Sequence, residues 1–419
     1  MKRKSAGAAA TPAAVTAGNK GGSNSQSAVP TGSKWMQAQL ASALMLGMMF
    51  LAAIFALQGV LLSSLIEHYG LEDSAQGLAS SAASAGGVIA LVSSVFLIGR
   101  LPKVTLLQIA LGVCAVFLAL LKLAPTFAVF VGLWLALGVG MGYVDMLLSS
   151  CMADLYTGRR ATQMMCILHM LYGVSSVICP PIYNGLMRGM AWNSVYLCVA
   201  AAGALLLAYT TLAARLMKRS GGSGLAEQKM NLKTAAKVIT KGALPGLIAA
   251  MFCHGMFLGG LNTWINRYVG VTLNSSLGGM ASSFMFFGVM ASRLLMPILP
   301  LSPVKYVRAA GFAAGAAVLI ALPMMNGWAM CIAVCLCGLA YGAMIPCMLD
   351  IGCAETPEST MLATTVMMLA LYLAQAVVSP VIGALESAFS LHAGIGLCGA
   401  FMLLCSGFCL IARLPKEKK

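Results

Sequence analysis

Apolar runs of about 20 residues, the length of helix that crosses a bilayer core of about 30 Å, dominate this chain. They recur along most of its length and are separated by short polar stretches. Backbone groups in lipid must be satisfied within the segment that carries them, so these runs are predicted to be helices and not strands. The pattern predicts twelve membrane-spanning helices, at residues 41–66, 76–99, 104–123, 126–150, 163–187, 193–215, 243–266, 276–297, 307–325, 328–350, 361–385 and 390–412.

Two polar stretches divide the chain. Residues 1–34 are rich in small residues with scattered lysines, cannot bury a core, and lack the apolar stretch of a cleavable signal peptide, so we expect a disordered tail. Residues 216–241, "LMKRSGGSGLAEQKMNLKTAAKVITK", bring glycine, serine and charge between the sixth and seventh helices. The expected organisation is a cytoplasmic tail (1–34), a six-helix bundle (35–215), a cytoplasmic linker (216–241), a second six-helix bundle (242–413) and a cytoplasmic tail (414–419).

Composition and charge fit a membrane protein. Of the 419 residues, 60% are hydrophobic and 9% are charged. The net charge of +15 raises the question of a nucleic-acid partner, but 23 of the 26 lysines and arginines fall on one side of the alternating helices. This is the positive-inside pattern, which predicts that both termini and the linker are cytoplasmic. We therefore expect a multi-pass protein of the cell (inner) membrane that binds no nucleic acid.

The sequence gives no sign of catalysis or of a cofactor. Most of the 14 cysteines stand singly within apolar runs, where they behave as small hydrophobic residues, so we expect no metal site. Phosphate-binding glycine loops, nucleophile elbows and metal-ligand helix motifs are absent from the sequence. These absences argue against an enzyme and against ATP-driven transport.

The two halves share a register with an offset of 200 residues. Gly138 and Gly142 correspond to Gly338 and Gly342. Single identities arise by chance in apolar sequence, but one register holds in three helix pairs, so we predict two parallel repeats. The other matches are Gly59, Leu61, Gly70, Leu171, Tyr172, Val177, Pro180 and Ile182 with Gly259, Leu261, Gly270, Leu371, Tyr372, Val377, Pro380 and Ile382.

Three segments carry a resemblance to a known family. They are "GVGMGYVDMLLSSCMADLYTGRRATQMMCILHMLYGVSSVICPPI" at 138–182, "GGLNTWINRYVG" at 259–270 and "GLAYGAMIPCMLD" at 338–350. The chain resembles the fucose/glucose/galactose permease-like branch of the major facilitator superfamily over about residues 40–413. The resemblance implies an all-α membrane protein of twelve helices in two parallel-repeat six-helix bundles, which acts as a secondary transporter by alternating access. Gln58 and Asn262 stand where that branch carries acids, which weakens the assignment to sugars and, less strongly, to proton coupling.

An acid lies inside the apolar run that precedes residue 156. A charged group near the bilayer centre costs about 3 kcal/mol or more, so Asp145 is expected to face a cavity or a partner. It lies nine residues before Asp154, and His169 lies nine residues after Arg160, which places both about 14 Å from the same turn. Asp145 and His169 are therefore predicted to face each other, either as a proton-coupling pair or as a structural hydrogen bond between two helices.

Other polar residues are candidates for contact with a transported solute, since the resemblance implies that the first, fourth, seventh and tenth helices surround the central path. Each also has a structural interpretation, such as packing or a place in the interfacial aromatic belt. The substrate-binding candidates are Gln58, Tyr143, His254, Asn262, Trp264, Tyr341 and Asp350.

The resulting hypothesis is a proton-coupled transporter, a symporter, that moves a small organic solute. A sugar-like solute is slightly favoured by the resemblance. The 30 methionines suit an adaptable apolar site, so efflux of drug-like or amphiphilic solutes is the alternative. A solute sensor that does not transport is the alternative of another class. We expect a monomer whose partners are the solute, a proton and the lipid bilayer.

Labelling of introduced cysteines from either side of the membrane tests the topology. Residue 1, the 216–241 linker and residue 419 should all react from the cytoplasmic face, because 23 of the 26 basic residues lie on that side. An external C-terminus would contradict the helix count and, with it, the two-repeat prediction.

Overall fold

The computed structural model describes residues 34–70, 78–97, 100–219, 236–237, 239–240, 242–357, 359–412 and 414, so the predicted tails and most of the linker lie outside it. All regular structure in the described ranges is helical. The elements are α1 (Lys34–Tyr69), α2 (Leu78–Leu97), α3 (Lys103–Leu121), α4 (Phe127–Leu155), α5 (Arg159–Met187), η2 (Trp192–Ser194), α6 (Val195–Arg219), α8 (Leu244–Arg267), η3 (Tyr268–Thr272), η4 (Gly278–Met280), α9 (Ala281–Leu295), α10 (Pro303–Ala321), η5 (Leu322–Met324), α11 (Gly327–Tyr341), α12 (Met344–Glu355), α13 (Thr360–Ala388) and α14 (Leu391–Ile411).

The predicted membrane spans are largely confirmed. Among the described residues, 10 helices are long and apolar enough to cross a membrane. The second and eighth predicted spans correspond to two shorter apolar helices, Ala82–Leu97 and Ala281–Leu295. The all-helical membrane fold is therefore as predicted, with ten long spans and two short apolar helices in the described chain.

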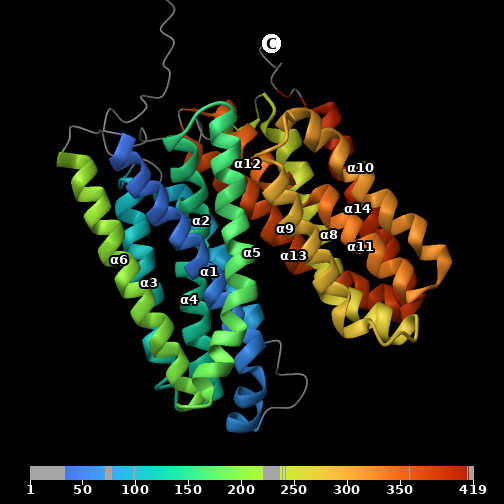
Figure 1. The fold of residues 1–419 in the computed structure, drawn as a ribbon, viewed down its shortest axis with the longest axis horizontal. Coiled ribbons are helices and arrows are strands. Elements are labelled where there is room, and N and C mark those ends of the chain that lie inside the picture. The colour runs from blue at the N-terminus through green and yellow to red at the C-terminus, as the bar shows by residue number, and fades with distance from the viewer. Residues whose placement is uncertain are drawn as a thin grey trace, which may run out of the picture.

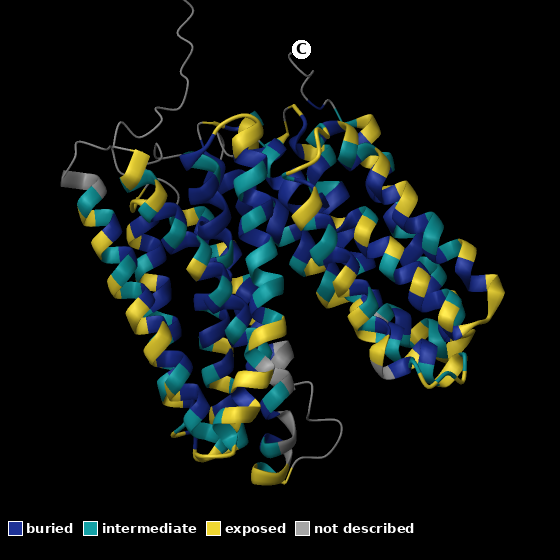
Figure 2. Cartoon of the chain, in the orientation of Figure 1, coloured by how far each residue is buried: buried dark blue, intermediate teal, exposed yellow. Residues whose placement is uncertain are grey.

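The helices form two groups, which we call the N-terminal bundle (α1–α6) and the C-terminal bundle (α8–α14) (Figure 1). Within the first, α2 packs on α4, α1 on α5 and α3 on both α4 and α6. Within the second, α9 packs on α11, α13 on α8 and α10 on both α11 and α14. Each bundle thus has its own core, and buried residues run through the middle of both (Figure 2).

The bundles meet at one end and diverge toward the other (Figure 1). We call the meeting end the basic end; it carries the start of α1 and the C-terminus. The helices that join the bundles there are α2 and α4 with α13, and α5 with α9 and α12. Buried side chains gather where these helices meet, at the top of Figure 2.

Close glycine contacts recur in the two bundles. A Cβ atom on Gly138 of α4 would lie 2.2 Å from the Ala83 carbonyl oxygen of α2, and one on Gly338 of α11 would lie 2.2 Å from the Met285 carbonyl oxygen of α9. Gly138 and Gly338 therefore permit close helix packing. Because the two glycines are 200 residues apart and make equivalent contacts, the packing supports the repeat register.

The tenth predicted helix, 328–350, is broken in the structure. It divides into α11 and α12, with Gly342 and Ala343 in a turn between them. Pro346 lacks the N–H group that would bond to the Gly342 carbonyl four residues earlier, so an uninterrupted hydrogen-bond ladder cannot form there. The Gly142 region, its counterpart in the first repeat, has no such proline and stays helical in α4.

Adding one methyl group at the α2–α4 contact should destabilise the protein. Gly138→Ala would place a Cβ 2.2 Å from a backbone oxygen, so the helices must move apart, at a cost of about 1–3 kcal/mol. A lowered melting temperature of the purified protein would show this. Gly132→Ala in the same helix is the matched control, because a Cβ added there would meet no atom within 4 Å. Equal melting temperatures for the two variants would contradict the packing role.

Candidate functional site

The first contact between the bundles, which we call the α13 seam, begins with a buried ion pair. Lys103 Nζ at the start of α3 lies 2.7 Å from Asp154 Oδ2 near the end of α4, and the Lys103 side chain is only 2% exposed. Thr360, the first residue of α13, donates to Asp154 Oδ1 at 2.7 Å and also bonds to Lys103. Ser150 adds a 3.1 Å bond to the same threonine hydroxyl. This polar cluster fixes the start of α13 to the N-terminal bundle.

The α13 seam continues deeper into the molecule with weaker polar contacts. Ser94 of α2 lies 3.0 Å from the hydroxyl of Thr365, which in turn contacts the Met146 sulfur at 2.7 Å. The innermost bond joins Tyr372, whose hydroxyl donates to Asp145 Oδ2 at 2.9 Å. Asp145 therefore has a partner in the opposite bundle, at the inner end of the hydrogen bonds that cross this seam in the described part of the chain.

The second contact, which we call the α5 seam, joins α5 to α9, α12 and the segment after α9. At the basic end, Gln163 donates to the Pro297 carbonyl at 2.8 Å and Arg159 to the Leu299 carbonyl at 3.4 Å. Thr162 donates to the Asp350 carboxylate of α12. Asp350, a predicted substrate contact, thus lies in the seam as an acceptor for the other bundle.

Arg293 of α9 lies at the inner part of the α5 seam. Its Nε donates to the Gly342 carbonyl at 2.9 Å, which is the carbonyl that Pro346 leaves without a helical partner. Its Nη1 donates at 2.9 Å to the backbone carbonyl of His169 in the opposite bundle. Tyr306 provides hydrogen bonds to other backbone groups at this break. Its hydroxyl donates to the Ala340 carbonyl at 2.6 Å and accepts from the amide of Ala343 at 3.2 Å.

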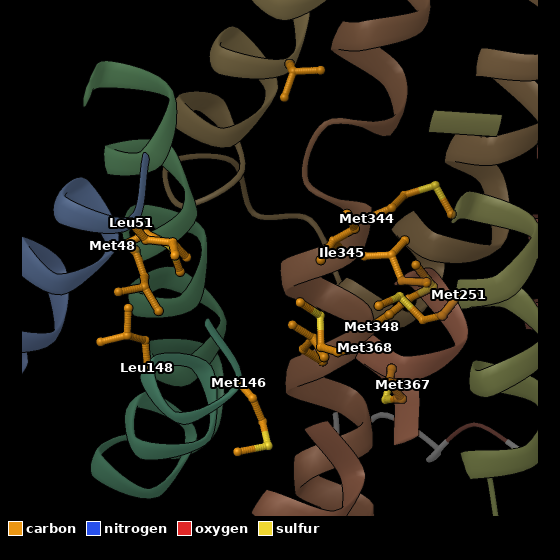
Figure 3. Close-up of a cluster of buried hydrophobic side chains, with 14 of the residues drawn as sticks. Met48, Leu51, Met146, Leu148, Met251, Met344, Ile345, Met348, Met367 and Met368 are labelled. Carbon is orange, nitrogen blue, oxygen red and sulfur yellow. The ribbon is translucent and has the colours of Figure 1, made fainter. Parts of the chain in front are cut away.

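Apolar side chains between these polar contacts include many methionines (Figure 3). Met146 belongs to α4, whereas Met348 of α12 and Met368 of α13 belong to the C-terminal bundle, and all three are buried. Methionine is unbranched and polarisable, so it can repack when a neighbouring surface shifts. The contact between the bundles therefore combines a few specific polar bonds with an adaptable apolar surface.

Asp145 and His169 do not form the predicted direct contact. The Nε2 atom of His169 lies 3.4 Å from the hydroxyl of Ser149, while Asp145 accepts from Tyr372. The prediction assumes that α4 and α5 run side by side without stagger. Ser149, one helical turn or about 6 Å beyond Asp145, is instead the residue of α4 beside His169.

Two substrate-binding candidates lie together inside the C-terminal bundle. The rings of His254 (α8) and Tyr341 (α11) meet edge to face with centroids 5.4 Å apart, and Phe257 packs against the same tyrosine. His254 is 0% exposed and Tyr341 is 2% exposed. Neither ring nitrogen of His254 nor the Tyr341 hydroxyl has a hydrogen-bond partner among the described residues. Buried polar groups are rarely left in this state, so these atoms mark a position for a polar ligand or water.

The remaining candidates are dispersed. Tyr143 of α4 is held within its own bundle by a 2.7 Å bond to Ser93. Asn262 is exposed and Trp264 half-buried, both near the end of α8 far from the basic end, and the Trp264 indole nitrogen has no partner among the described residues. Gln58 lies in α1, but its side chain lies outside the described part of the chain.

Several residues that join the bundles are not predicted from the sequence. In the sequence, Lys103 and Arg293 contribute only to the charge pattern that predicts the topology, and no pattern singles out Thr360. Tyr372 stands out only as the repeat partner of Tyr172. Its position in the repeat is the available signal.

The family model of the Major Facilitator Superfamily matches residues 44–361, which is most of the chain. The chain belongs to the major facilitator superfamily. No curated protein matches it by sequence. The family comprises transporters, so this member is a multi-pass membrane transporter and not an enzyme.

Solved structures of other major facilitator proteins share the fold at low sequence identity. The transporter FucP in an outward conformation gives a TM-score of 0.72 at 15% identity, over 89% of this chain and 98% of that one. The human organic anion transporter MFSD10 gives 0.73 at 15%, over 89% and 99%. The proton:xylose symporter XylE, bound to 6-bromo-6-deoxy-D-glucose, gives 0.69 at 15%, over 90% and 96%.

Removing the acid of the α13 seam should loosen the basic end of this major facilitator protein. Asp154→Asn breaks the ion pair of the buried Lys103 ammonium, a change that costs about 3–5 kcal/mol. The buried Cys353, whose thiol lies 3.4 Å from the Thr364 hydroxyl, should then react faster with N-ethylmaleimide, as read by mass spectrometry of its peptide.

Glu386→Gln is the control for this experiment. It removes an exposed ion pair, Arg267–Glu386, at the end far from the seam, so Cys353 labelling should not change. Unchanged Cys353 labelling in a folded Asp154→Asn protein would show that the ion pair does not hold the basic end closed.

Proposed function

We propose that this chain is a secondary active transporter that moves a small, sugar-like organic solute in symport with protons by alternating access. The observation that carries the proposal is the pattern of bonds between the bundles. They begin at the basic end with the bonds of Thr360 to Lys103 and Asp154 and reach inward as far as Asp145 and Arg293. A molecule of two bundles that is bonded at one end and divergent at the other suits a solute path that opens to one side at a time (Figure 1).

Asp145 is the proposed coupling group. It is half-buried in α4 and accepts a bond from Tyr372 of the opposite bundle. Protonation removes the charge that makes Asp145 a strong acceptor, so it changes the free energy of the closed seam relative to the open one. A titratable acid at the innermost bond of the α13 seam therefore links a proton to the movement of the bundles. His169 is the second coupling candidate, because it carries a titratable imidazole and its backbone accepts from Arg293 in the other seam.

A sugar-like solute is supported by two structural neighbours. FucP is a fucose:proton symporter of E. coli, and XylE is a proton:xylose symporter. Their identity to this chain is 14–15%, which supports a shared fold alone. The proposed substrate class therefore depends on the candidate residues Asn262, Trp264, His254 and Tyr341. An aromatic side chain beside an amide is a suitable pair for a polyhydroxylated ring.

Efflux of amphiphilic solutes is the second candidate function, and the methionines of the seam favour it. Met146, Met348 and Met368 offer a deformable apolar surface between the bundles (Figure 3). Solutes of varied shape bind to such surfaces more readily than to rigid polar sites. For both functions we place the protein in the inner membrane as a monomer, with its basic end and both termini in the cytoplasm.

Removing the titration of Asp145 should uncouple transport. Asp145→Asn keeps an oxygen that accepts the Tyr372 hydroxyl but cannot gain or lose a proton in the physiological range. Uphill, pH-gradient-driven uptake into proteoliposomes should be lost. Exchange of labelled solute down its own gradient requires no net proton movement and should persist.

Tyr372→Phe is the matched control, because it removes the same bond and keeps the acid. It should retain uphill uptake. If Tyr372→Phe and Asp145→Asn lose uphill uptake and exchange equally, Asp145 is only a structural acceptor. Full uphill uptake by Asp145→Asn would exclude Asp145 from coupling and leave Asp350, the acid of the α5 seam, as the next residue to test.

A further inference from the structure

The Arg293 guanidinium lies inside the molecule without a carboxylate partner among the described residues. It donates to the backbone carbonyls of Gly342 and His169. The three acids in the seams have other partners, since Asp145 accepts from Tyr372, Asp154 pairs with Lys103 and Asp350 accepts from Thr162. Carbonyl oxygens satisfy hydrogen bonds but leave the positive charge uncompensated, and an uncompensated charge at membrane depth is costly and functional by default.

The surroundings of Arg293 are rich in aromatic and imidazole groups and carry unused polar atoms. Its helix, α9, packs against α11 and α8, which carry Tyr341 and His254. Among the described residues, the buried side-chain polar atoms without a partner belong to His254 and Tyr341, which lie together, and to Trp264 farther along α8. Tyrosine and tryptophan present donors, and a histidine ring presents one as well. This part of the C-terminal bundle is therefore matched to a ligand that accepts hydrogen bonds.

We propose that the transported solute carries a carboxylate and that Arg293 is the residue that receives it, an inference that rests on the proposed function. Arginine has five N–H groups in a planar fork, and the hydrogen bonds of Arg293 to described residues involve only Nε and Nη1. Arg293 is half-buried, whereas His254 and Tyr341 are fully buried, so Arg293 is the most accessible residue of the three. A carboxylate fits the fork with two parallel bonds.

A neutral sugar would not compensate this charge. Its hydroxyl groups would replace water at the guanidinium but would leave one buried positive charge with no negative partner. A hydroxylated carboxylate of sugar size, such as a sugar acid, satisfies both the charge of Arg293 and the donors of Tyr341 and His254. The solute class is thus a small hydroxy acid.

Binding of a carboxylate at Arg293 would also act on the α5 seam. The Nη1 atom that faces the seam now donates to the His169 carbonyl of the N-terminal bundle. An anionic oxygen is a stronger acceptor than a carbonyl and competes for that donor. The bond to Gly342, inside the C-terminal bundle, can persist, so Arg293 stays in place while its bond to the other bundle is exchanged for the solute.

The test is a thermal-shift series on the purified full-length protein with matched pairs of probes. The pairs are D-galacturonate with D-galactose, D-glucuronate with D-glucose, and D-gluconate with D-sorbitol, each measured in neutral detergent. At least one carboxylate should raise the melting temperature while its neutral partner does not. Arg293→Gln should abolish that shift, and Arg293→Lys, which keeps the charge but loses the fork, should weaken the apparent affinity about tenfold or more.

Arg308→Gln is the matched control for loss of an arginine–carbonyl bond. Arg308 lies in the same bundle and donates to the Cys409 carbonyl at 3.3 Å, so its variant should keep the carboxylate shift. Tyr306→Phe removes the hydroxyl that donates to the Ala340 carbonyl at the break between α11 and α12, without changing the charge. This variant too should keep the carboxylate shift. If Arg293→Gln does not fold, the Arg293→Lys variant still decides, because equal affinity in that variant and the wild type contradicts the proposal.

Other outcomes overturn the inference in distinguishable ways. If no carboxylate shifts the melting temperature, or the neutral partners shift it equally, the solute is not recognised by its charge. If phosphatidylglycerol vesicles alone stabilise the wild type through Arg293, the residue binds a lipid phosphate. If a pH gradient drives uptake of a neutral sugar and Arg293→Gln does not change that uptake, the inference is refuted and the proposed function stands. If a carboxylate binds but no probe is taken up, the proposed function is refuted.

Discussion

The contact between the two bundles depends on how the carbonyl of Gly342 is hydrogen-bonded. Pro346 has no N–H to offer it, and lipid offers no water, so the structure must supply another donor. Arg293 supplies it at 2.9 Å and uses a second N–H to reach the His169 carbonyl of the opposite bundle at the same distance. One side chain therefore completes a broken helix and joins the two bundles. Because a backbone defect requires Arg293 at this position, its positive charge is held at the inner end of the α5 seam.

The sequence is sufficient for the architecture because the constraint behind it is general. Long apolar runs in lipid must be helical, and glycines such as Gly138 and Gly338 at the repeat spacing mark close helix contacts in both bundles. The site is less predictable because contacts between helices depend on their stagger. A stagger of one turn separates Asp145 from His169, and a partner 227 residues away, Tyr372, takes the expected place. Arg293 indicates only topology in the sequence, because a sequence does not reveal that an arginine near a helix end points inward.

The two repeats share a scaffold but differ in chemistry. Equivalent glycines bring α2 to α4 and α9 to α11, whereas the position of Asp145 in the first repeat holds Ile345 in the second. The N-terminal bundle thus contributes an acid to the interface, and the C-terminal bundle contributes Arg293 and the unpartnered groups of His254 and Tyr341 in the described chain. At the inner ends of the two seams, Asp145 and Arg293 thus place opposite charges on the two bundles, which a solute with both hydroxyl and acidic groups can meet from both sides.

A transporter must open the end that is closed in this structure. The free energy of the bonds between the bundles therefore cannot exceed what solute binding and protonation can offset. A typical protein hydrogen bond contributes only about 0.5–1.5 kcal/mol net, because water replaces it when it is broken. The bonds of Ser94 and Gln163 belong to this modest class, and the bond of Tyr372 joins it when Asp145 is protonated. The Lys103–Asp154 pair differs, since its side chains are 2% and 19% exposed, but both belong to the N-terminal bundle. Thr360 of α13 leaves this pair when the bundles part, so the ion pair stays intact while a hydroxyl and a repacking methionine surface release α13.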